Sequence, residues 1–148
     1  MATIGFIGGG NMAASLFGGR INAGYKAADL IVLDPSDAVR DALSTRFNID
    51  VKTEITAVDN CEIIVLAVKP QILKTVCQQL ASIQTRFSLI VSIAAGVRST
   101  DINRWLSQEQ TTTEQAIVRC MPNTPALLQC GASGLFANGS VSDKQKQQ

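Results

Sequence analysis

The sequence of 148 residues contains no histidine. This absence excludes Ser-His-Asp and Cys-His nucleophilic catalysis, histidine general bases and histidine metal sites. Any chemistry must therefore depend on a cofactor, on carboxylates or lysines, or on residues outside the chain. We assign no catalytic residue and no metal site within it.

Paired cysteine motifs are also missing. The chain has four cysteines, Cys61, Cys77, Cys120 and Cys130, and no two of them have the CxxC spacing of a zinc site or a redox dithiol. We expect reduced thiols in or near the core of a cytoplasmic protein.

Long apolar runs and blocks of basic residues are absent as well. No run approaches the roughly 20 residues that would span a bilayer, and the run after Met1 breaks at Gly8, too early for a signal peptide. The formal net charge of +1, without a basic block, does not indicate a surface that binds nucleic acid. We therefore expect neither a membrane nor a nucleic acid as partner.

What is present alternates between apolar runs and amphipathic segments. Apolar spacing predicts helices around 39–47, after Pro70, and at 102–106 with Ser99 or Thr100 as the cap. The runs that predict strands covered on both faces are 3–7, 30–33, 62–68, 88–94 and 116–121. This order predicts an α/β fold: a doubly wound, Rossmann-type sheet, mostly parallel, with helices on both faces.

The last nine residues, "SVSDKQKQQ", begin like a helix. Ser142 is a predicted cap, with Gln145 as its capping-box partner. The pattern then stops with almost no apolar face, which suggests a chain cut within a domain; a disordered polar tail is the alternative.

A glycine-rich turn follows the first predicted strand. The segment 8–13, GGGNMA, fits G-x-G-x-x-A between a strand and a helix. Gly8 would permit the tight turn, Gly10 would let the backbone approach a pyrophosphate, and Ala13 would let the helix pack closely. The helix N-terminus would offer free N–H groups to the phosphates. The turn predicts a dinucleotide site, with a purely structural turn as the alternative.

Asp34 ends the second predicted strand, 24 residues after Gly10. An acid at this position normally accepts hydrogen bonds from the adenosine ribose and disfavours a 2′-phosphate, which favours NAD over NADP. Ser36 could instead donate to a phosphate, and the nearest arginine is Arg40.

Three further loops follow strands that end at the same predicted edge: "AVKP" (67–70), "AAG" (94–96) and "PNTP" (122–125). Lys69 is expected to contact cofactor through its backbone, although a catalytic amine and a simple corner before proline are alternatives. Asn123 and Thr124 are candidates to orient nicotinamide or substrate, or to form a structural turn. Arg119 is expected to form a buried or edge ion pair.

Together, "IGFIGGGNMA", "LAVKP", "VSIAAGV" and "RCMPNTPALL" make the whole chain resemble the pyrroline-5-carboxylate reductases. The resemblance implies hydride transfer from NAD(P)H to the C=N bond of 1-pyrroline-5-carboxylate, giving L-proline in the last step of proline biosynthesis. It implies NADPH as the usual cofactor and places an adenosine-ribose or 2′-phosphate contact at Asp34, a position that often holds a small hydroxyl residue. The acid at this position departs from that pattern and leaves NADH open. The implied pyrophosphate segment is Ile7, Gly8, Gly9, Gly10, Asn11 and Met12. The implied nicotinamide contacts are Ala67, Val68, Lys69, Pro70 and Ala95.

Family members are roughly twice this length, because hydride transfer needs a substrate held against the nicotinamide. The resemblance implies that a helical C-terminal domain, absent from residues 1–148, forms the oligomer and supplies the substrate pocket. We therefore expect residues 1–148 to form an NAD(P)-binding domain with little turnover of its own. The alternatives are a related imine or β-hydroxyacid dehydrogenase and a non-catalytic dinucleotide sensor ending at Gln148.

Overall fold

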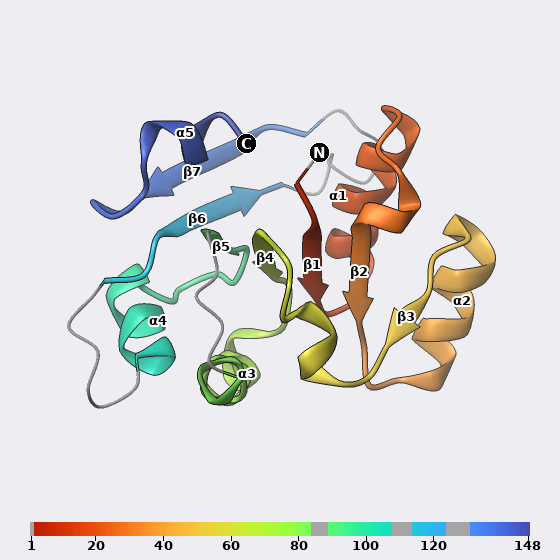
Figure 1. Cartoon of the computed structure of the whole chain (residues 1–148), viewed down its shortest axis with the longest axis horizontal. Coiled ribbons are helices and arrows are strands. Elements are labelled where there is room, and N and C mark those ends of the chain that lie inside the picture. Colours follow the sequence, from red (N-terminus) through yellow and green to blue (C-terminus); the bar gives the residue numbers. More distant parts are fainter. Residues whose placement is uncertain (1, 84–88, 108–113, 124–130) are drawn as a thin grey trace.

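The computed structural model of the chain describes residues 2–83, 89–107, 114–123 and 131–148. These residues form one seven-stranded sheet in the order β3-β2-β1-β4-β5-β6-β7, with helices packed against it (Figure 1). All neighbouring strands are parallel except β6 and β7, which are antiparallel. The strands are β1 Ile4–Ile7, β2 Leu30–Leu33, β3 Val51–Lys52, β4 Ile63–Leu66, β5 Leu89–Ser92, β6 Ile117–Pro122 and β7 Ser133–Ala137.

The five strands predicted from apolar runs are confirmed. Strands β1 and β4 are buried at every position, as expected for strands covered on both faces. Two strands were not predicted. β3 has only two residues, and four of the five residues of β7 are exposed, so neither carries an apolar run.

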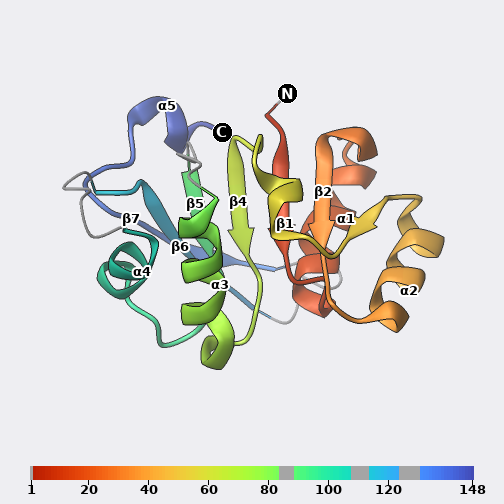
Figure 2. The ribbon, with the colours of Figure 1, turned by 60° about the horizontal axis from the view of Figure 1, so that its bottom comes forward.

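Helices cover both faces of the sheet, as predicted (Figures 1 and 2). Side chains of α3 and α4 join one buried cluster, and side chains of α1 and α2 join another on the opposite face. The helices are α1 Asn11–Asn22, α2 Asp37–Phe47, α3 Pro70–Ser82, α4 Ser99–Leu106 and α5 Asp143–Lys146, with short 3₁₀ turns at Ala27–Asp29 and Ile55–Val58. In the described part of the chain, no helix is long and apolar enough to cross a membrane.

Aromatic packing fixes α1 and α2 on their face of the sheet. The Phe17 ring, fully buried, meets Phe6 of β1 at 5.3 Å and Phe47 of α2 at 5.1 Å, both edge to face. Such contacts add about 0.5–1.5 kcal/mol per pair beyond the area that they bury. Ala13 is 1% exposed, which confirms that its small side chain lets α1 pack closely on the sheet.

The predicted helix starts are mostly correct. α3 begins at Pro70, and the predicted capping box is present at α5. There, Ser142 Oγ accepts from the Gln145 N–H at 3.2 Å, and the Ser142 N–H donates to Gln145 Oε1 at 2.8 Å. The predicted cap of α4 is wrong by one residue. Its N-cap is Arg98, with no side-chain capping bond, and Ser99 is the first helical residue.

The strand order has a switch point at β1. The chain runs from β1 outward to β2 and β3 and then crosses back to β4 on the other side of β1, which is the topological switch point of a doubly wound sheet. Ligands of such sheets bind beyond the carboxyl ends of the strands at this point. Both chain termini lie at the opposite end of the strands, where the parallel strands begin (Figure 2).

Candidate nucleotide-binding site

Gly8 begins the turn after β1 and is required by the protein itself. Its φ is +102°, and a Cβ built there would lie 2.4 Å from the carbonyl oxygen of Ala67. Two backbone bonds hold the strand ends together, from Gly8 N to Leu33 O and from Ala67 N to Ile7 O, both at 2.8 Å. The loops after β1 and β4 therefore touch at the switch point, and only glycine fits between them.

Gly10, unlike Gly8, is required neither by its backbone conformation nor by the space around it. Its φ and ψ of −66° and 177° suit any residue, and a Cβ there would meet nothing within 4 Å. Gly10 is also the N-cap of α1, which has no side-chain capping bond and no acidic residue in its first turn. The first N–H groups of a helix lack intrahelical partners and favour anions. The protein's own packing does not require a glycine here, whereas a phosphate lying against the backbone does.

Gly9, between Gly8 and Gly10, is buried and packed against α2. A Cβ at Gly9 would lie 2.6 Å from Leu43 Cδ1 and 3.1 Å from Val39 Cγ1, so α2 packs directly on the turn. The fingerprint leaves this position unspecified, and sequence reasoning missed its packing role. No local signal could have shown it, because Leu43 and Val39 are brought there by the fold.

Asp34 joins the glycine turn to the start of α2. Its Oδ2 accepts from the Gly9 N–H at 2.9 Å, and its Oδ1 accepts from the Ser36 N–H at 2.9 Å. Each carboxylate oxygen keeps a further lone pair, so the same group can still accept from a ribose hydroxyl. The bracing of the turn by Asp34 was not predicted, and its predicted ribose contact stays a prediction.

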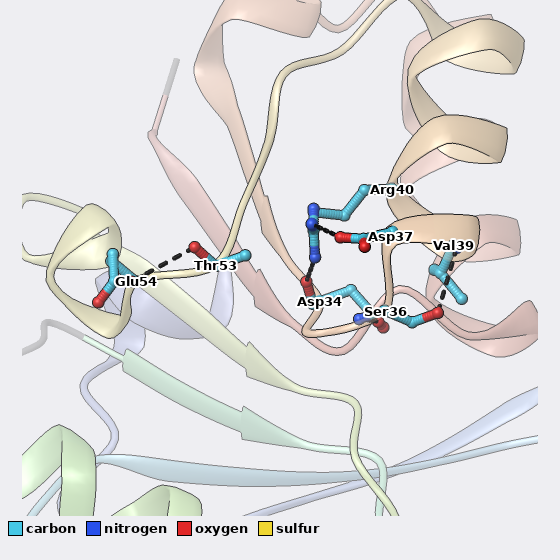
Figure 3. Close-up of polar contacts among 7 residues, drawn as sticks. All are labelled: Asp34, Ser36, Asp37, Val39, Arg40, Thr53 and Glu54. Atoms are coloured by element: carbon cyan, nitrogen blue, oxygen red, sulfur yellow. Dashed lines mark hydrogen bonds and ion pairs between the residues drawn. The ribbon is translucent and has the colours of Figure 1, made fainter.

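Charged groups surround the same junction (Figure 3). Nη1 of the Arg40 guanidinium donates to the Asp34 carbonyl at 3.1 Å, and Nη2 pairs with the Asp37 carboxylate. Ser36 is the N-cap of α2, where its Oγ accepts from the Val39 N–H at 3.5 Å. In contrast to α1, the N-terminus of α2 thus already holds a cap and an acid.

The loop after β4 lies against the glycine turn. Ala67 and Val68 are half-buried, and Val68 Cγ1 would be 3.3 Å from a Cβ at Gly8. Lys69 and Pro70 are exposed at the start of α3, where the Lys69 carbonyl accepts from the Ile72 N–H at 3.1 Å. The structure therefore brings residues 67 and 68 beside the turn, with the Lys69 backbone fixed as the helix cap.

The loop after β5 is the next along this edge, because β5 pairs with β4. Ala94 is held by a bond from its N–H to Ser92 Oγ at 3.3 Å, and Gly96 turns the chain with a φ of +72°. Ala95, between them, is exposed. A residue with a small side chain is thus presented where the predicted nicotinamide contact would lie.

The loop after β6 is described only at its beginning. Asn123 Oδ1 accepts from the Ala132 N–H at 3.0 Å, which joins the two ends of the intervening segment and favours a structural role for Asn123. Thr124 lies outside the described residues.

The ion pair expected for Arg119 is not found among the described residues. Within the described ranges no acidic group pairs with it, its Nε is buried without a hydrogen-bond partner, and its Nη2 reaches only Met121 Sδ at 3.9 Å.

Three cysteines are free and buried, as expected, and Cys130 lies outside the described residues. Burial raises the pKa of Cys61 to about 11 and that of Cys77 to about 12. Burial also raises the pKa of Cys120, partly offset by a hydrogen bond with Ser133. Thiols of this kind stay protonated at neutral pH and are poor nucleophiles.

Comparison with known protein families decides the membership of the chain. Residues 3–96 match the family described as "NADP oxidoreductase coenzyme F420-dependent". The chain belongs to this family. The matched region runs from β1 through the loop after β5, so it contains the glycine turn, Asp34 and residues 67–70.

Individual members confirm the resemblance noted in the sequence. Pyrroline-5-carboxylate reductase of Pseudomonas aeruginosa is 48% identical over 146 residues, which is 98% of this chain and 52% of that protein. The Coxiella burnetii pyrroline-5-carboxylate reductase structure has a TM-score of 0.89 at 37% identity, covering 99% of this chain and 53% of that one. The Plasmodium falciparum pyrroline carboxylate reductase, solved with NADP bound, has a TM-score of 0.80 at 28% identity and covers 99% and 52%. The chain spans about half the length of these relatives.

For a member of this oxidoreductase family, the site has the parts that a dinucleotide needs. An uncapped helix N-terminus lies behind an open glycine, which fits a pyrophosphate. An aspartate ends β2, where the adenosine ribose binds in doubly wound sheets. The exposed backbone of the loops after β4 and β5 completes the edge on which a nicotinamide can lie.

Proposed function

We propose that residues 1–148 form the dinucleotide-binding half of a pyrroline-5-carboxylate reductase. The observation that carries this proposal is Gly10, whose missing side chain leaves open space at an uncapped helix N-terminus. Nothing in the fold requires glycine at this position, and a pyrophosphate against the backbone does. The names of the relatives support the choice of substrate.

Each part of the site has a role in this proposal. The segment Ile7–Met12 borders the pyrophosphate. The N–H groups at the start of α1, from Gly10 onward, bind it, because those of Gly8 and Gly9 already donate to Leu33 and Asp34. Asp34 accepts from the ribose. Residues 67–70 and Ala95 border the nicotinamide, and Asn123 and Thr124, the latter outside the described residues, are the candidates to orient the nicotinamide or the substrate. The cofactor supplies a hydride to the imine carbon of 1-pyrroline-5-carboxylate, the imine nitrogen takes a proton, and L-proline and NAD(P)⁺ result.

The chain's contribution to the reaction is binding and orientation. With no histidine in the sequence and the three described cysteines buried, its residues hold the hydride donor rather than exchange protons with the substrate. A cyclic imine that arrives protonated needs little acid catalysis. We propose that the substrate pocket and a homo-oligomeric contact come from a helical region like the half of the relatives that this chain does not match, and that the protein acts in the cytoplasm.

A chimera tests the substrate. Fusing residues 1–148 to the unmatched half of the Pseudomonas aeruginosa relative should give NAD(P)H-dependent reduction of 1-pyrroline-5-carboxylate, followed by the loss of nicotinamide absorbance. Residues 1–148 alone should bind the dinucleotide and turn over little or no substrate. Gly10→Ala in the chimera should abolish most of the activity.

Gly139→Ala is the matched control for Gly10→Ala. A Cβ at Gly139 also meets nothing within 4 Å. Gly139 follows β7, which is antiparallel to β6 and therefore ends where the parallel strands begin, away from the glycine turn. It should leave activity unchanged. A chimera that binds NADH but reduces only other imines or oxidises 3-hydroxy acids would refute the substrate while preserving the nucleotide site. Strong proline formation by residues 1–148 alone would refute the division of labour.

A further inference from the structure

The junction between β2 and α2 carries an ion pair that already occupies its arginine. Arg40 donates through Nη1 to the Asp34 carbonyl at 3.1 Å and through Nη2 to the Asp37 carboxylate (Figure 3). The Arg40 side chain is 22% exposed, and that of Asp37 is 89% exposed. The guanidinium is thus held on the protein, while its acidic partner stands in solvent.

Other charges near the end of β2 do not offset these acids. Lys52 of β3, whose carbonyl accepts from the Asp34 N–H at 3.1 Å, pairs through its ammonium group with Asp50. Glu54 follows, and its carboxylate accepts from Thr53 Oγ1 at 3.4 Å. The two cations near the end of β2, Arg40 and Lys52, are therefore each paired with an aspartate. The Asp34 carboxylate adds a further negative charge.

This balance matters because NADP differs from NAD only by a 2′-phosphate on the adenosine ribose, and that ribose binds at the end of β2. A phosphate carries about two negative charges at pH 7 and is best bound by an arginine with free N–H groups. Here it would meet the Asp34 carboxylate and would have to displace Asp37 from Arg40.

We propose that Asp37 acts as a built-in anion on Arg40, competes with the 2′-phosphate for it, and so makes the chain bind NADH in preference to NADPH. This inference rests on the proposed dinucleotide site and names the form of cofactor that the site selects. It assigns to Asp37 a role in cofactor selectivity that is separate from the role of Asp34.

The contacts of the two aspartates distinguish their roles. Asp34 braces the Gly9 and Ser36 N–H groups, so its replacement disturbs the turn that both cofactors use. In the described part of the chain, Arg40 is the only polar partner of the Asp37 side chain. Its replacement should therefore change NADPH binding and leave NADH binding as it was.

The test is calorimetric titration of the 148-residue protein with NADH and with NADPH at low salt. The wild type should bind NADH more tightly. Asp37→Asn should lower the dissociation constant for NADPH about tenfold, because one negative charge facing a dianion is removed, with NADH changed by less than about twofold. Adding Arg40→Gln to Asp37→Asn should reverse the gain for NADPH.

Asp143→Asn is the matched control. Asp143 is also the first residue of a helix after a serine cap, and it pairs with Lys146 three residues on, at 2.9 Å, on α5 at the opposite end of the strands. It should change neither affinity. Tighter binding of NADPH than NADH by the wild type, or an unchanged ratio in Asp37→Asn, would overturn the inference while leaving the dinucleotide site in place. Failure of both cofactors to bind would overturn the proposed function and this inference with it.

Discussion

Replacing Gly8 and Gly10 separately by alanine distinguishes a glycine that the fold requires from one that the ligand requires. At Gly8 the new methyl group would lie 2.4 Å from the Ala67 carbonyl oxygen, on a backbone with φ of +102°. A non-glycine residue in such a conformation costs about 1–3 kcal/mol, and the overlap with backbone costs about 1–3 kcal/mol more. The Gly8→Ala variant should therefore lose about 2–6 kcal/mol of a total of about 5–15 kcal/mol.

At Gly10 the same methyl group would enter open space on an allowed backbone. The free energy of unfolding of Gly10→Ala should match the wild type within about 0.5 kcal/mol. The methyl group would nevertheless stand where the pyrophosphate approaches the backbone. We expect the affinity for NADH to fall by about 5- to 150-fold, from an overlap cost of about 1–3 kcal/mol.

Urea unfolding and calorimetric titration with NADH measure the two effects. Trp105, the only tryptophan in the sequence, packs against the core from α4 and reports unfolding by its fluorescence. With a slope of about 2 kcal/mol per molar urea, the midpoint of Gly8→Ala should fall by about 1–3 M, while that of Gly10→Ala stays in place. Wild-type NADH affinity in Gly10→Ala would refute the position of the pyrophosphate. A wild-type midpoint in Gly8→Ala would refute the close approach of the two loops.

Three further predictions concern the core and its buried polar groups. Phe17→Ala should lose about 3–5 kcal/mol in urea unfolding, because a fully buried ring with two edge-to-face partners is removed; a loss under about 1 kcal/mol would contradict this packing. Arg119→Met should leave this chain equally stable or about 1 kcal/mol more stable, since the buried Nε has no partner to lose; marked destabilisation would reveal a partner for the guanidinium. The Cys61 and Cys77 thiols should react with a disulfide reagent at pH 8 only on unfolding, as mapped by mass spectrometry, and fast labelling of the native protein would refute their burial. Their pKa values of about 11 and 12 exceed the ordinary value of 9.0, so their contribution to stability should be complete below pH 9 and decline above it, as the unfolded thiols ionise first.

The fold was predictable where the sequence carries unbroken apolar runs. Strands β1, β2, β4, β5 and β6 were each predicted because parallel strands between two helical layers must be apolar on both faces. β7 was missed because its residues, including Leu135 and Phe136 at 71% and 60% exposure, lie at an edge without that covering. An exposed edge strand leaves no periodic signal of its own.

The site was predictable in its local chemistry and less so in its long-range contacts. The spacing of Gly8, Gly10 and Ala13 reflects a turn and a helix within one short segment, so it can be read directly from the sequence. The bond from the Gly9 N–H to Asp34 joins residues 25 positions apart, and it depends on the pairing of β1 with β2. The partner expected for Arg119 could not be identified for a related reason: a charge in a strand indicates that a partner is needed, not which residue supplies it.

The position of the dinucleotide is tested most directly by the backbone N–H signals of the isotope-labelled 148-residue protein during titration with NADH. The largest NMR shift changes should occur at residues 8–13, with further changes at 67–69 and at Ala95, and no comparable change around Gly139 at the opposite end of the strands. In Gly10→Ala the same shifts should require about 5- to 150-fold more NADH, as expected for an overlap cost of about 1–3 kcal/mol. Saturable shifts centred away from the glycine turn, or an unchanged response in Gly10→Ala, would contradict the assignment of this edge as the nucleotide site.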